Sequence, residues 1–86
     1  MSSYSQLSHV YGLRFTNRLP FDVFIDVFGA QGRVIEAGNV WAYYNPPEHM
    51  DSFIVRCSGQ GRKLWEQELV RGNYNIELNG ARHVFE

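Results

Sequence analysis

The sequence has little cysteine and no long apolar run. Its single cysteine, Cys57, excludes an internal disulfide and fits a reducing compartment, so we expect a cytoplasmic protein. The longest apolar runs fall far short of the roughly 20 residues that a membrane span requires. A signal peptide has a basic stretch that leads into an apolar run. The Ser-rich start of this sequence does not show that pattern. We therefore expect no membrane partner.

An excess of charge of one sign is also missing. Eight Lys and Arg residues stand against nine Asp and Glu residues, which gives a net charge of −1 and a pI near 6.3. Such a chain has no overall field that would draw it onto phosphate backbones or anionic lipids. This balance argues against nucleic acid as a partner. Single-stranded nucleic-acid binding stays as a second alternative, because six basic residues are interleaved with aromatic ones. These are Arg14, Arg18, Arg56, Arg62, Lys63 and Arg71.

No metal-binding motif is present. The residues that could bind zinc are scattered and show none of the spacings of a preformed zinc site. They are His9, His49, His83 and Cys57. Cys57 falls on the inward side of its expected strand, where a small buried apolar residue is typical. We expect neither a metal nor a cofactor.

Catalytic motifs are equally sparse. Asp22 and Asp26 share one face of an expected strand, but positions four apart on a strand lie roughly 13 Å apart. Glycosidase carboxylate pairs lie about 5–9.5 Å apart, so the more natural role of these acids is to keep a sheet face soluble. The Gly-Gln-Gly-Arg-Lys run at 59–63 lacks the Gly-Lys-Ser/Thr ending of a phosphate loop. We expect a protein that is not an enzyme.

What is present is a strong alternation of apolar and polar residues, with turn signals about every 8–12 residues. This pattern predicts an all-β fold, a small antiparallel β-sandwich or partly open barrel of seven to eight short strands. No helix separates the strands as a βαβ unit requires, so we expect no parallel crossover. Strands are expected at 10–16, 21–28, 33–36, 40–44, 52–58, 63–71, 74–78 and 81–85. Residues 63–71 contain good helix formers, but their turn-bounded setting favours a strand.

The domain organisation follows from the length and the aromatic content. A chain of 86 residues buries one core, and its six Phe, two Trp and five Tyr residues can fill that core without help. Residues 1–9 lack periodicity and are expected to form a flexible tail, followed by a single domain at 10–86. Asn79-Gly80 is the strongest two-residue hairpin signal.

Two groups of apolar and aromatic side chains are more than one two-layer core should hold. Phe24 and Phe28 fall on the nominal solvent face of the strand at 21–28, and Ile54 falls on the outer face of the strand at 52–58. Either a loop or the segment 63–71 covers this face, or the face contacts another chain.

The second feature is the aromatic strand at 41–44 and the loop at 45–51 that follows it. Consecutive strand residues point to opposite faces, so Trp41 and Tyr43 cannot lie in the same layer as Tyr44. Rigid aromatics next to a Pro-stiffened loop offer recognition area at low entropic cost. The alternative is that the aromatics fill the core and the loop only bridges two strands. The binding candidates of the loop are Pro46, Pro47, His49 and Met50.

The order of Phe15, Asn17 and Arg18, then residues 23–28, a Gly turn and a Pro-containing loop resembles the β-domain of the von Hippel–Lindau protein. The resemblance covers about half of the chain. The His and Trp residues with which that domain grips hydroxyproline have no counterpart at residues 48–53. We carry no function across.

These observations favour a non-enzymatic protein-interaction module, which binds a protein partner or a second copy of itself to make a homo-oligomer. The first alternative is a small-ligand or carbohydrate-binding domain. In that domain, Trp41, Tyr43, Tyr44 and His49 would meet the ligand.

Overall fold

The described residues form eight strands because apolar and polar residues alternate along most of the sequence, so that a strand can bury one of its two faces. The computed structural model describes residues 12–28, 32–44 and 46–85. The strands are β1 (Leu13–Asn17), β2 (Val23–Val27), β3 (Arg33–Ile35), β4 (Val40–Tyr43), β5 (Ser52–Gly59), β6 (Arg62–Val70), β7 (Gly72–Glu77) and β8 (Gly80–Val84).

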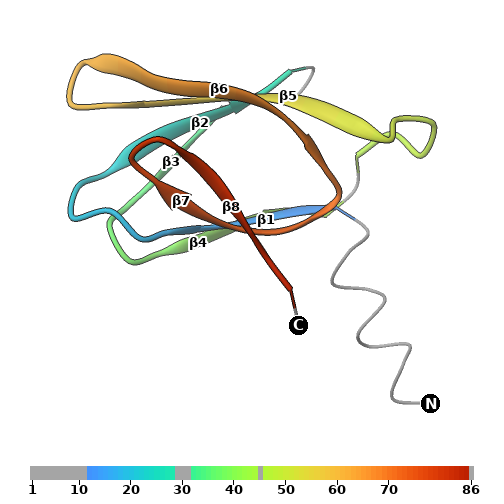
Figure 1. The fold of residues 1–86 in the computed structure, drawn as a ribbon, viewed down its shortest axis with the longest axis horizontal. Helices are drawn as coiled ribbons and strands as arrows, with labels where there is room; N and C mark the ends of the chain where they lie inside the picture. The colour runs from blue at the N-terminus through green and yellow to red at the C-terminus, as the bar shows by residue number, and fades with distance from the viewer. Residues whose placement is uncertain (1–11, 29–31, 45, 86) are drawn as a thin grey trace.

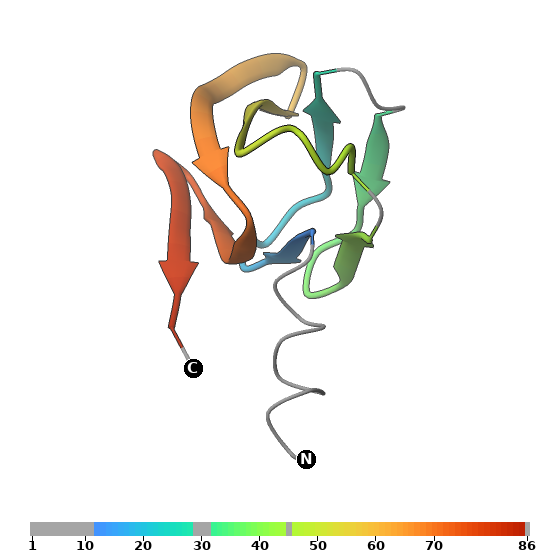
Figure 2. The ribbon, with the colours of Figure 1, turned by 90° about the vertical axis from the view of Figure 1, so that its right-hand side faces the viewer.

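The strands make two sheets of four that face each other across the core, as Figures 1 and 2 show. Sheet A has the order β4-β1-β7-β8, and sheet B has the order β3-β2-β5-β6. The expected all-β sandwich of seven to eight short strands is confirmed. No helix in the described residues is long and apolar enough to cross a membrane. The expected tail at residues 1–9 and the turn at 29–31 lie outside the described residues.

One ladder departs from the antiparallel pattern. β1 and β7 pair in parallel, with Leu13 opposite Gly72 and Phe15 opposite Tyr74, whereas every other ladder is antiparallel. After β1 the chain crosses to sheet B for β2 and β3, returns to sheet A as β4, and crosses again for β5 and β6 before β7 pairs with β1. The parallel partners are therefore far apart in sequence, and no local turn signal announces their pairing.

The inner faces of both sheets form the core. The buried side chains alternate along the strands: Leu13 and Phe15 on β1, Val23, Ile25 and Val27 on β2, Phe53, Val55 and Cys57 on β5, Trp65 and Leu69 on β6, and Tyr74 and Ile76 on β7. The segment at 63–71 was expected to be a strand, and most of it forms β6. Trp65 and Leu69 face inward, and β6 pairs with β5 along the whole length of β5.

Two expected boundaries are corrected. The strand expected at 21–28 is shorter, because Phe21 lies before it with its carbonyl bound by a side chain, and Phe28 lies in the following turn. The turn of the last hairpin is Leu78-Asn79, one residue earlier than Asn79-Gly80. Gly80 belongs to β8 because it approaches β6 closely: a Cβ atom there would lie 2.7 Å from Gln67 Oε1.

The two open sides of the sandwich differ. On one side β6 is joined across the sheets to the end of β7 and to β8, since Trp65 Nε1 donates to the Glu77 carbonyl at 2.9 Å and Ala81 N donates to Gln67 Oε1 at 2.6 Å. On the other side β3 and β4 are the end strands of their sheets and share no ladder. The sandwich is therefore closed along β6 and β8 and open along β3 and β4.

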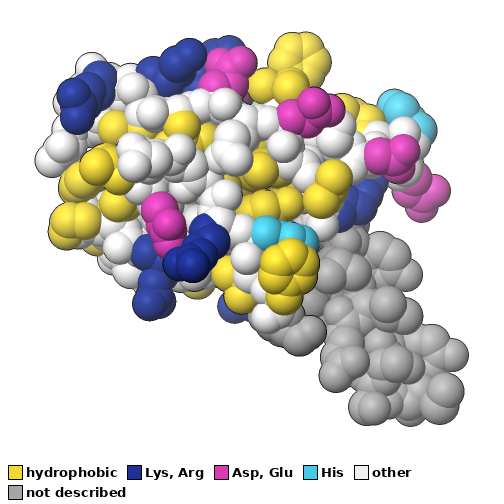
Figure 3. Space-filling model, viewed as in Figure 1, with side chains coloured by type: hydrophobic (Ala, Val, Ile, Leu, Met, Phe, Trp, Pro, Cys, Tyr) yellow, Lys and Arg dark blue, Asp and Glu magenta, His cyan; other side chains and the backbone are white. Residues whose placement is uncertain are grey.

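On the face shown in Figure 3, hydrophobic side chains reach the surface in separate groups with charged side chains between them. Each exposed apolar group is therefore a separate patch, bordered by the side chains next to it on the surface.

The hairpin between β5 and β6 offers a small gain in stability. Gln60 and Gly61 have φ values of 54° and 79°, which is the pair of positive angles that a type I′ turn requires. Gln tolerates this region poorly, so Gln60→Asn is expected to raise the free energy of unfolding by about 0.5–1 kcal/mol. Urea denaturation measures the change. Gly61→Ala is the opposing control and should lower stability, and equal effects of the two variants would contradict the assignment.

Candidate functional site

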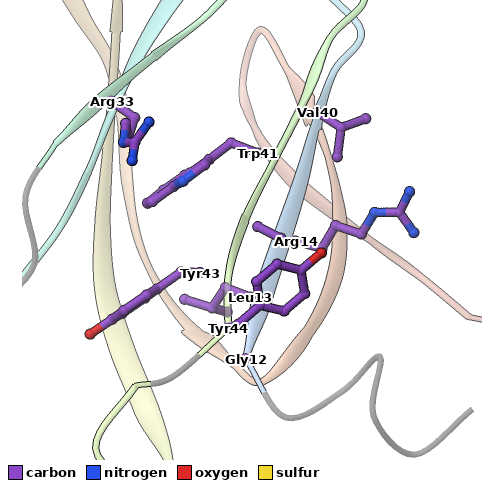
Figure 4. Close-up of a pocket in the computed structure, with 9 residues that line it drawn as sticks. Gly12, Leu13, Arg14, Arg33, Val40, Trp41, Tyr43 and Tyr44 are labelled. Carbon is purple, nitrogen blue, oxygen red and sulfur yellow. The ribbon is translucent and has the colours of Figure 1, made fainter. Parts of the chain in front are cut away.

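A groove runs along β4 on the open side of the sandwich. It encloses about 540 Å³ and is lined by the whole of β4 together with Leu13, Arg14, Arg33 and Tyr44. Figure 4 shows Trp41 and Tyr43 projecting from the side of β4 on which Arg33 lies, with Trp41 next to Arg33, whereas Tyr44 and Arg14 lie on the other side. This placement confirms that Trp41 and Tyr43 do not share a layer with Tyr44, as the alternation of a strand requires.

The aromatic wall of the groove is anchored in the core. Trp41 and Tyr43 are half-buried, and their rings are nearly parallel at 6° with centroids 6.2 Å apart. Trp41 also stacks on the fully buried Phe15, with centroids 6.1 Å apart. From Phe15 the row of rings continues through Tyr74 to His83. Because its inner end is fixed in the core, this wall is rigid rather than adaptable.

The charges on the groove are both positive. The Arg33 guanidinium carbon lies 5.9 Å from the centre of the Trp41 ring, which is cation–π range. Arg14 is exposed on the other side of β4. Neither arginine makes a salt bridge to a described residue, and no acidic residue lines the groove.

The loop that follows β4 is held in place by Arg71. One of its guanidinium nitrogens donates to the carbonyl oxygens of Pro47 at 2.7 Å and Met50 at 2.9 Å, and the group also lies over the Phe53 ring at 5.4 Å. Met50 N donates to the Pro47 carbonyl at 3.1 Å, which closes a turn at residues 47–50. These hydrogen bonds fix the loop to the end of β6.

The loop residues therefore point in different directions. Pro46 is buried, and Met50 is half-buried against the core. Pro47 and His49 are exposed on the turn. Asn45 lies outside the described residues. Of the four aromatic and His residues considered for a small ligand, Trp41, Tyr43 and Tyr44 line the groove, with Tyr44 on the opposite side of β4 from the other two. His49 lies on the turn and does not line the groove.

The outer face of sheet B carries the other candidate surface. Phe24 is 45% exposed, Phe28 is 74% exposed and Ile54 is 41% exposed, so within the described residues neither a loop nor β6 covers them. Val34 is 63% exposed and lies directly opposite Phe24 on β3. Sequence reasoning missed Val34, although its place in the alternation of β3 would have indicated it. The Phe24 ring also packs on Gly32, where a Cβ atom would lie 2.3 Å from it.

The register divides this outer face into bands. Phe24 and Val34 form one apolar pair, and Phe28 lies next to Ile54, whose carbonyl accepts its N–H at 2.9 Å. Between the two apolar pairs runs a charged row of Asp26, Arg56 and Glu66, which lie opposite one another across β2, β5 and β6.

The charged row is held by ion pairs. Arg56 approaches Asp26 at 4.0 Å and Glu66 at 3.0 Å, and Lys63 lies 3.6 Å from Glu66. The hydrogen bond and charge of Arg56 hold the pKa of the Glu66 carboxyl below its usual range. All these groups are partly exposed, so they contribute more to the specificity of the surface than to stability.

Metal ligands do not gather in the described part of the chain, where no group of three His, Cys, Asp or Glu side chains could hold an ion. Comparison with protein-family models, with curated proteins and with solved structures finds no match to this chain. Any statement about function therefore rests on the two surfaces described above, the groove along β4 and the outer face of sheet B.

Proposed function

We propose that this domain is a non-enzymatic protein-interaction module that associates with a second copy of itself through the outer face of sheet B. The observation that carries the proposal is the exposure of four large apolar side chains on that face: Phe24, Phe28, Val34 and Ile54. The solvent face of a two-layer sandwich is ordinarily polar. Exposed apolar area that is rimmed by polar residues is typical of protein contact sites.

The banded arrangement of this face suits a two-fold symmetric contact. In such a contact the same surface serves on both subunits, so the side chains of one copy have to face compatible side chains of the other copy after the rotation. An axis parallel to the strands, midway between β2 and β5, would bring Phe28 of one copy onto Ile54 of the other. The same rotation would place Arg56 of one copy next to Asp26 of the other. Opposite charges would then meet in the centre of the contact, beside the apolar pair.

The charged row gives this contact its register. Like charges that face each other across an interface are costly, so sliding one sheet over the other by one band would set charges against apolar rings. Phe24 and Phe28 would contribute most of the affinity, because aromatic side chains bury the largest area per residue.

Sedimentation velocity from micromolar to millimolar concentration tests the proposal. The wild-type chain is expected to shift from monomer to dimer over this range. Phe28→Glu should weaken the association by about a hundredfold or more, because each of two symmetric side chains loses roughly 1.5–3 kcal/mol of burial. Phe28 lies outside the core and 74% exposed, so the variant should keep its fold.

Phe85→Glu is the matched control. Phe85 is 83% exposed and follows β8 of sheet A, so it is an equally accessible ring on the other sheet. This variant should dimerise as the wild type does. A wild type that stays monomeric throughout, or equal effects of the two variants, would overturn the proposal.

A further inference from the structure

The edge of β4 that faces away from β1 has no partner strand in the described residues. β4 is the end strand of sheet A, and its single ladder is the one with β1. An end strand presents a row of N–H and C=O groups, which can pair with another extended chain. The opposite side of the sandwich does not offer such an edge, because β6 is linked there to the β7–β8 hairpin by side-chain hydrogen bonds.

The groove beside this edge has the features that would fix an added strand in register. Side chains of an extended segment alternate between two sides. On one side they would meet Trp41, Tyr43 and the Arg33 guanidinium, and on the other side they would meet Val40, Tyr44 and Arg14. Each side therefore offers apolar area and one cation.

The charge of the groove selects its occupant. The chain as a whole carries −1, yet the charged side chains that line the groove are two arginines, Arg14 and Arg33, with no salt bridge in the described residues. Arg33 is already directed over the groove by its contact with Trp41. Guanidinium groups bind carboxylates with two parallel hydrogen bonds, so an acidic side chain on either side of the added strand would be recognised.

We propose that the groove along β4 binds an extended acidic segment of another protein, which adds as a strand to the edge of β4. The backbone of the segment pairs with β4, its apolar side chains pack on Trp41 and Tyr43, and its carboxylates pair with Arg33 and Arg14. This mode of recognition is β-strand addition, in which backbone bonds give affinity and side-chain pockets give specificity. The inference does not rest on self-association, which uses the other sheet.

Two other occupants fit the groove less well. A second copy that paired edge to edge would bring the two arginines of each chain together, and like charges that face each other across an interface are costly. The chain's own first eleven residues contain no Asp or Glu, so they lack the carboxylates that the arginines would bind.

The test is a selection of displayed random peptides on the immobilised full chain. The expected result is enrichment of sequences in which Asp or Glu alternates with apolar residues. A selected peptide, synthesised and titrated against the chain, should bind at least about tenfold more weakly to Arg33→Glu. A version of the peptide with Lys in place of its acids should bind Arg33→Glu better than it binds the wild type.

Arg62→Glu is the matched control, since Arg62 is an exposed arginine at the β5–β6 turn, away from the groove. It should bind the acidic peptide as the wild type does, and so should Phe28→Glu, which separates this site from the self-association surface. Amide hydrogen exchange by NMR gives the second measurement, in which the peptide should slow exchange within Val40–Tyr43. Failure to enrich any peptide, enrichment without acidic residues, equal loss in both arginine variants, or unchanged exchange in β4 would each overturn the proposal.

Discussion

Asn17→Ala is expected to lower the free energy of unfolding by about 3–5 kcal/mol, which is near the upper limit for a single substitution. Asn17 is fully buried at the end of β1. Its side-chain nitrogen donates to the carbonyl oxygens of Phe21 and Ile35, both at 2.9 Å, and its side-chain oxygen accepts the Leu19 N–H at 2.9 Å. Alanine would leave two carbonyl groups and one amide of the backbone without these partners.

The cost is large because the side chain ties together three segments of backbone. Asn17 binds the chain on either side of Pro20 and also reaches Ile35 at the end of β3, so it couples the β1–β2 connection to sheet B. Each buried polar group that loses its partner costs about 1–3 kcal/mol. Urea denaturation followed by fluorescence measures the loss.

Asn39→Ala is the matched control for this position. The Asn39 side chain donates to Glu36 Oε1 at 3.2 Å in an exposed turn, so its removal should cost less than about 1 kcal/mol. If Asn17→Ala cost no more than Asn39→Ala, the side chain of Asn17 would not hold the three segments together.

The local part of the fold was predictable from the alternation of residues. β2 and β5 show it most clearly, since Val23, Ile25 and Val27 are buried while Phe24 is exposed. β6 shows why propensity is a weaker guide than pattern: its helix-forming residues still make a strand because Trp65 and Leu69 complete the core.

The non-local part was not predictable. The role of Asn17 could not be predicted, because nothing in its sequence neighbourhood indicates that Ile35, eighteen positions away, will accept its hydrogen bond. The parallel pairing of β1 with β7 has the same cause, as does the shifted turn at Leu78-Asn79, since Gly80 serves contact with Gln67 rather than the turn. In each case the deciding partner lies on a distant strand.

The candidate surfaces, like the fold, have a local part that was predictable from the sequence and a non-local part that was not. The exposure of Phe24 and Phe28, and the separation of Trp41 and Tyr43 from Tyr44, follow from a period of two and were predictable. The approach of Arg33 to Trp41 depends on how two end strands of different sheets meet. The anchoring of the 45–51 loop by Arg71 likewise joins segments that lie far apart in sequence.

Raising the pH from 9 to 11 is expected to destabilise the wild-type chain by about 2–3 kcal/mol more than it destabilises Cys57→Ala. Cys57 is fully buried on β5, and burial raises the pKa of its thiol from 9.0 to about 11. Within this window the unfolded chain has lost the thiol proton, whereas the folded chain retains it. The folded state thus binds more protons, so the free energy of unfolding falls as the pH rises.

Urea denaturation of both proteins at a series of pH values measures this difference. Cys57→Ala creates a small cavity and starts from a lower stability, but that loss does not depend on pH. Burial also raises the pKa of Tyr74, and this contribution is common to both proteins and cancels in the comparison. The two stability curves should converge as the pH passes through the window and run parallel above it. Curves that stay parallel throughout would show that the thiol titrates at its ordinary pKa, which would require water to reach the interior face of β5.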